Sequence, residues 1–142
     1  MRVLLLSLVF RPDNVSTAHI MADLAADLVT SGHHVSVFTT TPHYNRDRGA
    51  EESQRLRWFW GPLLRTSESH GARVYHAWMP RKGASVILRL AAWVWFHLVS
   101  TVAAILLGGP TDVILAPSPP LTVGVSAWIV GRLRGARGRT PA

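Results

Sequence analysis

Apolar side chains fill nearly every position at the start of the chain. Behind Arg2, residues 3–10 are apolar except for Ser7. Strands that are apolar on both faces are typical of parallel sheets with helices on each side. A secretory leader also begins with a basic residue and an apolar run, but this run is short and no small-residue cleavage site follows. We therefore expect a buried parallel strand here.

A helix with one apolar face is predicted next, from about residue 18 to residue 31. Ser16 and Thr17 are candidate N-caps, and Gly32 is a candidate C′ residue. Residues 34–39 then have the pattern of a second strand. The apolar helical positions recur at spacings of one, three and four: Ile20, Met21, Leu24, Ala25 and Leu28. Strand, helix, glycine and strand predict a right-handed βαβ unit and a parallel sheet.

Further along the chain the pattern predicts two more strands and a last helix. The strands are residues 73–78 and 112–116, and the helix is residues 121–133. Between residues 41 and 71 the apolar periodicity breaks down, which favours one long loop. Together these elements predict a single α/β domain, a Rossmann-like parallel sheet of four strands with flanking helices.

Residues 90–107 contain no charged side chain, and three interpretations of them remain open. A crossover helix buried against the sheet is favoured, because the segment joins two strands of one sheet. A spanning helix is the second, since eighteen helical residues reach about 27 Å. In the third, the helix packs on the sheet and also contacts a membrane through Arg89, Trp93, Trp95 and Phe96. We expect a helix that is membrane-associated at most, and not spanning.

Composition narrows the class of protein. Of 142 residues, 48% are hydrophobic and 16% charged, and the formal net charge is +7. The absence of cysteine excludes a disulfide scaffold and a thiolate metal site. A basic chain with six tryptophans suits an anionic membrane surface at least as well as nucleic acid. The basic residues are dispersed rather than gathered on one helix, so nucleic acid ranks last and we expect none as a partner.

Common catalytic signatures are missing from the sequence. The seven histidines show no His-x-His or His-x-x-x-His spacing and no accompanying carboxylate cluster, so we expect no metal site. The P-loop, the Gly-x-Ser-x-Gly elbow and the dinucleotide glycine motif are also absent. We expect no cofactor to be bound by this chain.

Two loops are candidates for a binding site. In a doubly wound sheet, ligands lie at the carboxyl ends of the strands, beside helix N-termini. The loop after the first strand places Arg11, Asn14, Ser16 and Thr17 there, and the loop 117–122 brings Ser118 to the same edge. The alternative is that these residues only form a turn, a cap and a strand end.

Short motifs follow one another along the chain in a recognisable order. In the first third they are Phe10-Arg11-Pro12-Asp13, Ser16-Thr17-Ala18-His19, Ala22-Asp23-Leu24-Ala25, Ser31-Gly32-His33-His34-Val35 and Thr39-Thr40-Thr41-Pro42-His43-Tyr44. Later come Ser118-Pro119-Pro120-Leu121-Thr122 and Arg132-Leu133-Arg134-Gly135-Ala136-Arg137. Their order and spacing resemble the N-terminal domain of bacterial family 4 glycosyltransferases of the GT-B class. The closest subgroup builds capsule, O-antigen and exopolysaccharide units.

This resemblance implies an incomplete N-terminal half of a GT-B fold over residues 1–137, with 138–142 as a tail outside the family pattern. It implies a lipid-linked or saccharide acceptor at Arg11, Asn14, Ser16, Thr17 and Ser118. The nucleotide sugar donor would be held by a C-terminal GT-B domain, encoded separately or lost, so this chain alone would be inactive. The enzyme would be cytoplasmic and peripheral on the inner face of the cell membrane. The competing interpretation is a non-catalytic, membrane-associated fragment or docking protein.

One departure from the family pattern concerns the first loop. Family members carry a pair of glycines there, whereas this chain has Asn14, Val15, Ser16 and Thr17. Only glycine lets the backbone approach a diphosphate very closely. We therefore do not expect the backbone of this loop to approach a diphosphate closely.

Overall fold

The computed structural model describes residues 1–80, 85–117, 121–135 and 137–139. Their elements, in chain order, are β1 (Arg2–Leu6), α1 (Ser16–Thr30), β2 (His34–Thr40), α2 (Arg48–Ser53), β3 (Arg57–Trp60), β4 (Leu64–Ser69), β5 (Ala72–Ala77), α3 (Val86–Leu107), β6 (Val113–Leu115), α4 (Thr122–Arg134) and β7 (Arg137–Arg139). Over these residues the strands form one seven-stranded sheet in the order β3-β4-β5-β2-β1-β6-β7.

The centre of the sheet confirms the predicted Rossmann-like fold. β1 pairs in parallel with β2 on one side and with β6 on the other, and β2 pairs in parallel with β5. The two strands whose following loops we expected to share a site are therefore neighbours. β7 extends the parallel part beyond β6, over residues that the sequence had assigned to the end of the domain and its tail.

The long loop predicted for residues 41–71 is wrong. The segment contains α2 and the strands β3 and β4, where β3 pairs antiparallel with β4 and β4 pairs antiparallel with β5. β4 has the sequence LRTSES, and every side chain of β3 is exposed. Neither strand shows the apolar alternation of a half-buried strand, so strand pairing rather than local pattern determines them: β4 adds to β5, and β3 adds to β4.

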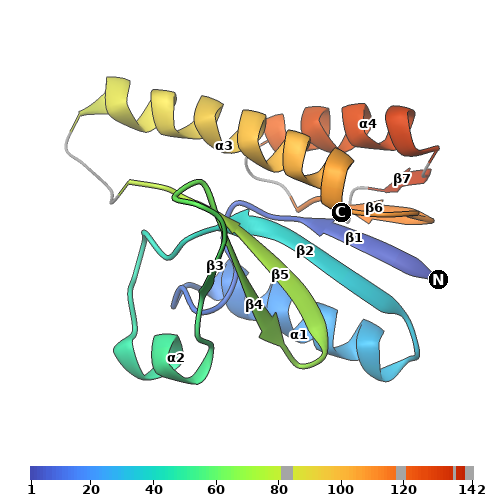
Figure 1. Ribbon diagram of the computed structural model, residues 1–142, viewed down its shortest axis with the longest axis horizontal. Coiled ribbons are helices and arrows are strands. Elements are labelled where there is room, and N and C mark those ends of the chain that lie inside the picture. Colours follow the sequence, from blue (N-terminus) through green and yellow to red (C-terminus); the bar gives the residue numbers. More distant parts are fainter. Residues whose placement is uncertain (81–84, 118–120, 136, 140–142) are drawn as a thin grey trace.

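Helices cover both faces of the sheet, α1 on one side and α3 with α4 on the other (Figure 1). Successive side chains of β1 point to opposite faces, as in any strand. Leu4 and Leu6 pack in the cluster that contains Phe96 of α3, whereas Val3 and Leu5 pack in the cluster that contains Met21 of α1. Both faces of β1 are thus core, which explains its unbroken apolar run.

The predicted end of α1 is confirmed. Gly32 has φ of 86°, and its N–H donates to Val29 O while the N–H of His33 donates to Leu28 O. This is the Schellman arrangement, which needs a residue that tolerates positive φ. It turns the chain directly into β2.

α3 connects β5 to β6 as a crossover helix. It is long and apolar enough to cross a membrane by length and composition, a test that the core helix of a soluble protein also passes. Only 28% of the most apolar 18-residue stretch of this helix is buried. The predicted crossover is confirmed, but the helix is buried along one face only.

Candidate functional site

The sheet has a topological switch point between β1 and β6. The chain leaves β1 toward β2 and β5, and then α3 carries it back across to β6 on the other side of β1. The adjacent strands β1 and β6 therefore end at the same carboxyl edge of the sheet. The crevice at such a switch point is where open α/β sheets bind their ligands.

Three polar side chains meet where the chain leaves β1 and enters α1. Arg11 Nη2 donates to His19 Nδ1 at 2.9 Å, and His19 Nε2 donates to Asn14 Oδ1 at 2.7 Å. This chain of bonds requires a neutral His19 with its proton on Nε2. We call Arg11, Asn14 and His19 the switch-point cluster. The structure thus brings together two of the predicted residues, and it adds His19.

Arg11 is a half-buried cation that lacks an anionic partner. In the part of the chain that the structure describes, no carboxylate forms a salt bridge with it, and its Nε is buried without a hydrogen-bond partner. The neutral imidazole of His19 orients the guanidinium without neutralising it. Such a group suits a phosphate or carboxylate, because the guanidinium offers a planar fork of donors.

The first turn of α1 adds to this electropositive corner. The N-cap is Val15, which has no side chain that could cap, and Ser16 and Thr17 lie exposed in the first turn. The prediction that Ser16 or Thr17 caps the helix is therefore wrong. The positive end of the helix has no side-chain cap and contains no acidic residue. Ser118, the fifth predicted acceptor residue, lies outside the described residues.

Asp13 holds the loops after β1 and β2 together. Its buried carboxylate accepts the backbone N–H groups of His43, Tyr44 and Asn45 at 3.2, 3.0 and 2.7 Å. Charge-assisted hydrogen bonds of this kind are strong, and three of them fix the local backbone. The aspartate of the Phe10–Asp13 motif is therefore a positioning residue for the switch-point cluster.

His43 is a buried residue of the loop after β2, next to Asp13. Its Nδ1 donates to Thr41 O at 3.1 Å, and burial lowers the pKa of its imidazole. Nε2 is then an acceptor, and it is buried without a hydrogen-bond partner among the described residues. An unsatisfied acceptor of this kind costs free energy unless a donor reaches it.

A buried polar network connects the switch-point loop to the antiparallel strands. Gln54 Nε2 donates to Arg11 O and to Ser67 Oγ, both at 3.0 Å, and His76 Nδ1 donates to Thr40 O at 3.0 Å. Ser67 Oγ donates to His76 Nε2 at 2.7 Å. This pair has the spacing of a nucleophile and its base, but burial lowers the pKa of His76 to about 4. Such a weak base, inside the core, makes the network structural.

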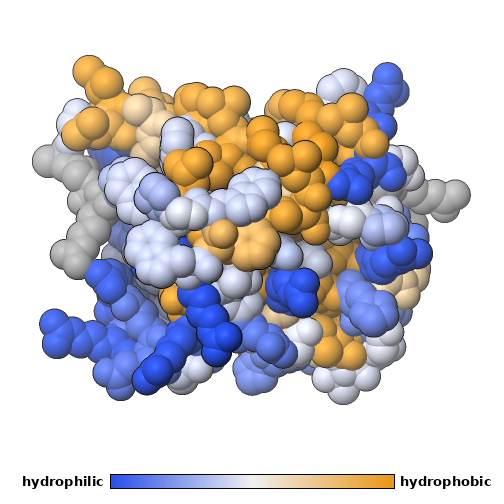
Figure 2. Space-filling model, in the orientation of Figure 1, coloured by the Kyte–Doolittle hydropathy of each residue, from blue (hydrophilic) through white to orange (hydrophobic). Residues whose placement is uncertain are grey.

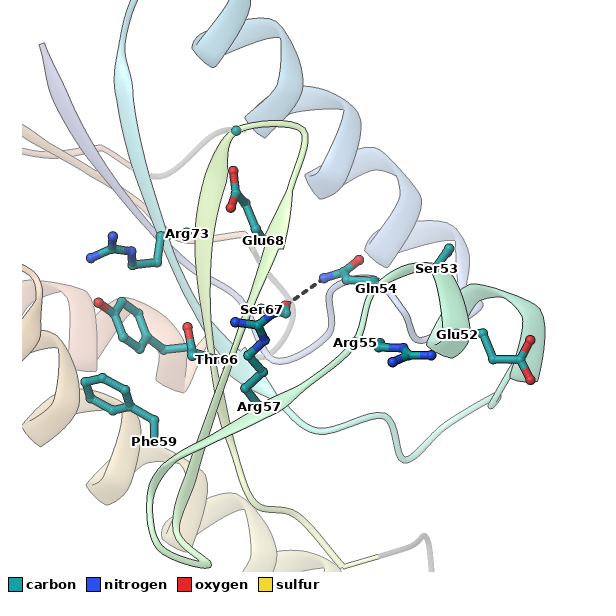
Figure 3. Close-up of a pocket in the computed structure, with 12 residues that line it drawn as sticks. Glu52, Ser53, Gln54, Arg55, Arg57, Phe59, Thr66, Ser67, Glu68 and Arg73 are labelled. Atoms are coloured by element: carbon teal, nitrogen blue, oxygen red, sulfur yellow. Dashed lines mark hydrogen bonds between the residues drawn. The ribbon is translucent and has the colours of Figure 1, made fainter.

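Two hollows lie near these groups. The smaller, of about 270 Å³, is at the carboxyl edge and includes Arg46, Arg65 and Trp78 in its lining. The larger, of about 770 Å³, lies over the antiparallel strands, between their side chains and the end of α2 (Figure 3). Arg57, Phe59 and Arg73 line it. We place the site at the switch-point cluster, because Arg11, which has no carboxylate partner among the described residues, and the uncapped N-terminus of α1 lie together there.

Three of the four predicted membrane-contact residues reach the surface, and the fourth is buried. Arg89 and Trp93 are exposed, and half-buried Trp95 donates its Nε1–H to Trp78 O at 3.0 Å. Phe96 is 0% exposed and packs against the sheet, so its assignment as a membrane contact is wrong. α3 is apolar on all sides, so its sequence could not indicate which side faces the sheet.

The sequence predicted Arg11 and Asn14 but missed three residues of the site. His19 bonds to groups five and eight positions away, and Asp13 bonds to the backbone of His43 thirty positions away. The sequence shows the motif that contains His19, but it does not indicate that His19 hydrogen-bonds to Arg11. Among the described residues, no group of three or more His, Asp or Glu side chains could hold a metal ion.

The parallel core, with its switch point between β1 and β6, is the Rossmann-like arrangement found in GT-B glycosyltransferases. One solved structure with this fold is the catalytic domain of starch synthase IV from Arabidopsis thaliana, bound to ADP and acarbose. It matches 99% of this chain with a TM-score of 0.63 and 17% sequence identity. This chain covers 33% of that one. No family model and no curated protein sequence matches the chain.

Proposed function

We propose that this chain is the acceptor-binding half of a glycosyltransferase of the family 4 type, acting in cell-surface polysaccharide synthesis. The donor is a nucleotide sugar held by a second GT-B domain. The acceptor is a lipid-linked sugar whose phosphate group binds the switch-point cluster. The fold shared with a glycosyltransferase and the order of the sequence motifs support the reaction class.

The observation that carries the acceptor assignment is the unneutralised, oriented guanidinium of Arg11. His19 holds it at 2.9 Å, and the uncapped first turn of α1 begins five residues later. A cation kept without a carboxylate beside a helix N-terminus favours an anionic ligand. Asn14, Ser16 and Thr17 offer hydrogen bonds to the sugar hydroxyls next to that anion. A free saccharide, the other acceptor considered, would leave Arg11 without a counterion.

Binding measurements test this proposal directly. Isothermal titration of the purified chain with a short-chain prenyl diphosphate sugar should show binding that Arg11→Ala weakens about 10- to 100-fold. That range corresponds to one lost charge-assisted contact of about 1.5–3 kcal/mol. The thermal midpoint should hardly change, because the Arg11 side chain is partly exposed.

Arg48→Ala is the matched control, since it removes an exposed arginine from α2 and should leave the affinity unchanged. Pyrophosphate should compete with the ligand, whereas the same sugar without its diphosphate should not. Equal affinities of the Arg11→Ala variant and the parent chain would remove the switch-point cluster from the acceptor site. Absence of binding by the parent chain would reject the acceptor role itself.

A further inference from the structure

The side of α3 that faces away from the sheet is a continuous apolar stripe. Its residues recur every three or four positions and are 51% to 78% exposed: Ile87, Leu90, Val94, Leu98, Val102 and Leu106. On a helix of a water-soluble domain this side normally carries polar and charged residues. The stripe runs the whole length of the helix, about 33 Å for 22 residues.

α4 widens this stripe into a surface. It packs beside α3, where His97 lies 2.8 Å from Thr122 and 3.0 Å from Ser126. Exposed apolar residues at the start of α4 and along it are Leu121, Val125, Trp128, Ile129 and Leu133. We call the stripe on α3 together with these residues the apolar face. In Figure 2 hydrophobic residues cover the edge of the molecule formed by α3 and α4. Exposed patches of this extent mark interaction sites.

Every charged side chain on the two helices is an arginine. They are Arg89 on α3 and Arg132 and Arg134 on α4. Arg132 lies over the Trp128 ring, with 5.5 Å between its Cζ and the ring centroid. Aspartate and glutamate are absent from both helices. The two helices that carry the apolar face therefore bear only cationic charge, which complements an anionic partner and repels a cationic one.

Aromatic side chains lie at one end of this face. Trp78 is 46% exposed, and Trp95 of α3 is bonded to its carbonyl oxygen. Trp60 is exposed at the end of β3. Tryptophan is the residue that concentrates at the headgroup level of a bilayer, where its ring is buried and its N–H reaches a polar group. An apolar face with an aromatic and cationic border matches the layers of a membrane interface.

The packing of α3 fixes how the helix meets a bilayer. Its opposite side is core, where Phe96, Ser100 and Ala104 are at most 1% exposed. The strands before and after it, β5 and β6, belong to the same sheet. A helix held against the sheet and α4 from Ala92 onward lies in the plane of the interface and does not span the membrane.

We propose that the apolar face docks this protein on an anionic lipid bilayer, with α3 and α4 lying flat at the headgroup–acyl boundary. A second copy of the chain fits this face less well, because two identical surfaces would bring arginine borders together without acidic partners. The inference stands on different residues from the proposed sugar transfer. If both hold, the N-terminal end of α3 brings the bilayer to the sheet edge that carries Arg11, which favours a lipid-linked acceptor.

Vesicle sedimentation with the full chain tests this inference. The protein should bind vesicles of phosphatidylcholine with 25% phosphatidylglycerol much more tightly than vesicles of phosphatidylcholine alone. The double variant Val94→Glu, Leu98→Glu should lower the partition coefficient at least tenfold, because it places two carboxylates on the docked side. Replacing Arg132 and Arg134 by glutamine should lower it about fivefold for each charge on the anionic vesicles.

Ile20→Glu is the matched control, because Ile20 is 61% exposed on α1, which covers the opposite side of the sheet. Its vesicle binding should equal that of the parent chain. Three results would each overturn the proposal. One is unchanged binding of the double glutamate variant, and another is retention in the pellet after washes with high salt and carbonate, which indicates a spanning helix. The third is a combination of two observations. The parent chain forms a dimer without lipid and does not bind vesicles, and the double variant is monomeric.

Discussion

His76 shows how one residue can look catalytic and still be structural. Its ring bonds to Ser67 and to Thr40 O and has no access to solvent. A serine beside an imidazole is the usual start of a nucleophilic site, but that imidazole must accept a proton near neutral pH. Burial lowers the pKa of His76 to about 4, so here the ring remains a neutral hydrogen-bonding group.

The same residue predicts how stability depends on pH. Its folded-state pKa of about 4 lies below the ordinary value of 6.5, so between these values the unfolded chain binds a proton that the folded chain rejects. The free energy of unfolding should therefore fall as the pH is lowered from 6.5 to 4, by at most about 3 kcal/mol from this group. Burial also lowers the pKa of His43, so this residue too should make the free energy of unfolding fall as the pH is lowered.

Urea titrations at pH 7.5, 6 and 4.5 would measure this loss. His76→Gln should flatten the dependence, although it lowers stability at pH 7.5 because the buried bonds are broken. His34→Gln removes an exposed histidine and serves as the control. A His76→Gln chain with the same pH slope as the parent would show that this residue does not set the dependence.

Among the elements, the β4–β5 hairpin joins the antiparallel strands to the parallel part of the sheet. Its two-residue turn places His70 at φ of 47° and Gly71 at φ of 84°, between the paired residues Ser69 and Ala72. Positive φ at both central positions is the type I′ geometry, which matches the twist of the strands. Histidine is tolerated at the first position, but asparagine is preferred there.

His70→Asn should therefore stabilise the protein by about 0.5 kcal/mol, since it relieves a positive φ at an exposed side chain without touching the core. His70→Val should be destabilising, because a β-branched residue is strained at this φ. The midpoint of urea unfolding would measure both changes. A valine variant as stable as the asparagine variant would contradict the dependence on turn conformation.

How far the sequence predicts the elements depends on where their stabilisation comes from. β1, α1 and β2 are buried against one another, so their apolar patterns are strong and local, and they were predicted. β3 carries exposed aromatic side chains and β4 carries mainly polar ones, and both strands form by pairing, β4 with β5 and β3 with β4. In the same way, Arg11 and Asn14 could be placed by topology alone. The role of Asp13 could not, because its partners lie about thirty residues away.

For the whole molecule, the site supplies binding groups more clearly than groups for chemistry. The switch-point cluster offers one oriented cation and a neutral imidazole, and the adjacent Asp13 carboxylate accepts three backbone N–H groups. The chain spans a third of the starch synthase chain that it resembles. The proposed function places donor binding in a second domain. We therefore expect the 142-residue chain to bind an acceptor without transferring sugar to it.

That expectation can be tested by adding the second domain. The purified chain, mixed with UDP-glucose or ADP-glucose and a prenyl diphosphate sugar, should release no nucleoside diphosphate above the buffer rate. A fusion to the C-terminal half of a GT-B glycosyltransferase should release it, and Arg11→Ala in the fusion should raise the KM for the acceptor more than it lowers kcat, because Arg11 binds the acceptor before and during the reaction. Arg48→Ala in the same fusion should change neither constant. Turnover by the unfused chain, lost on Arg11→Ala, would show instead that these residues already contain a complete active site.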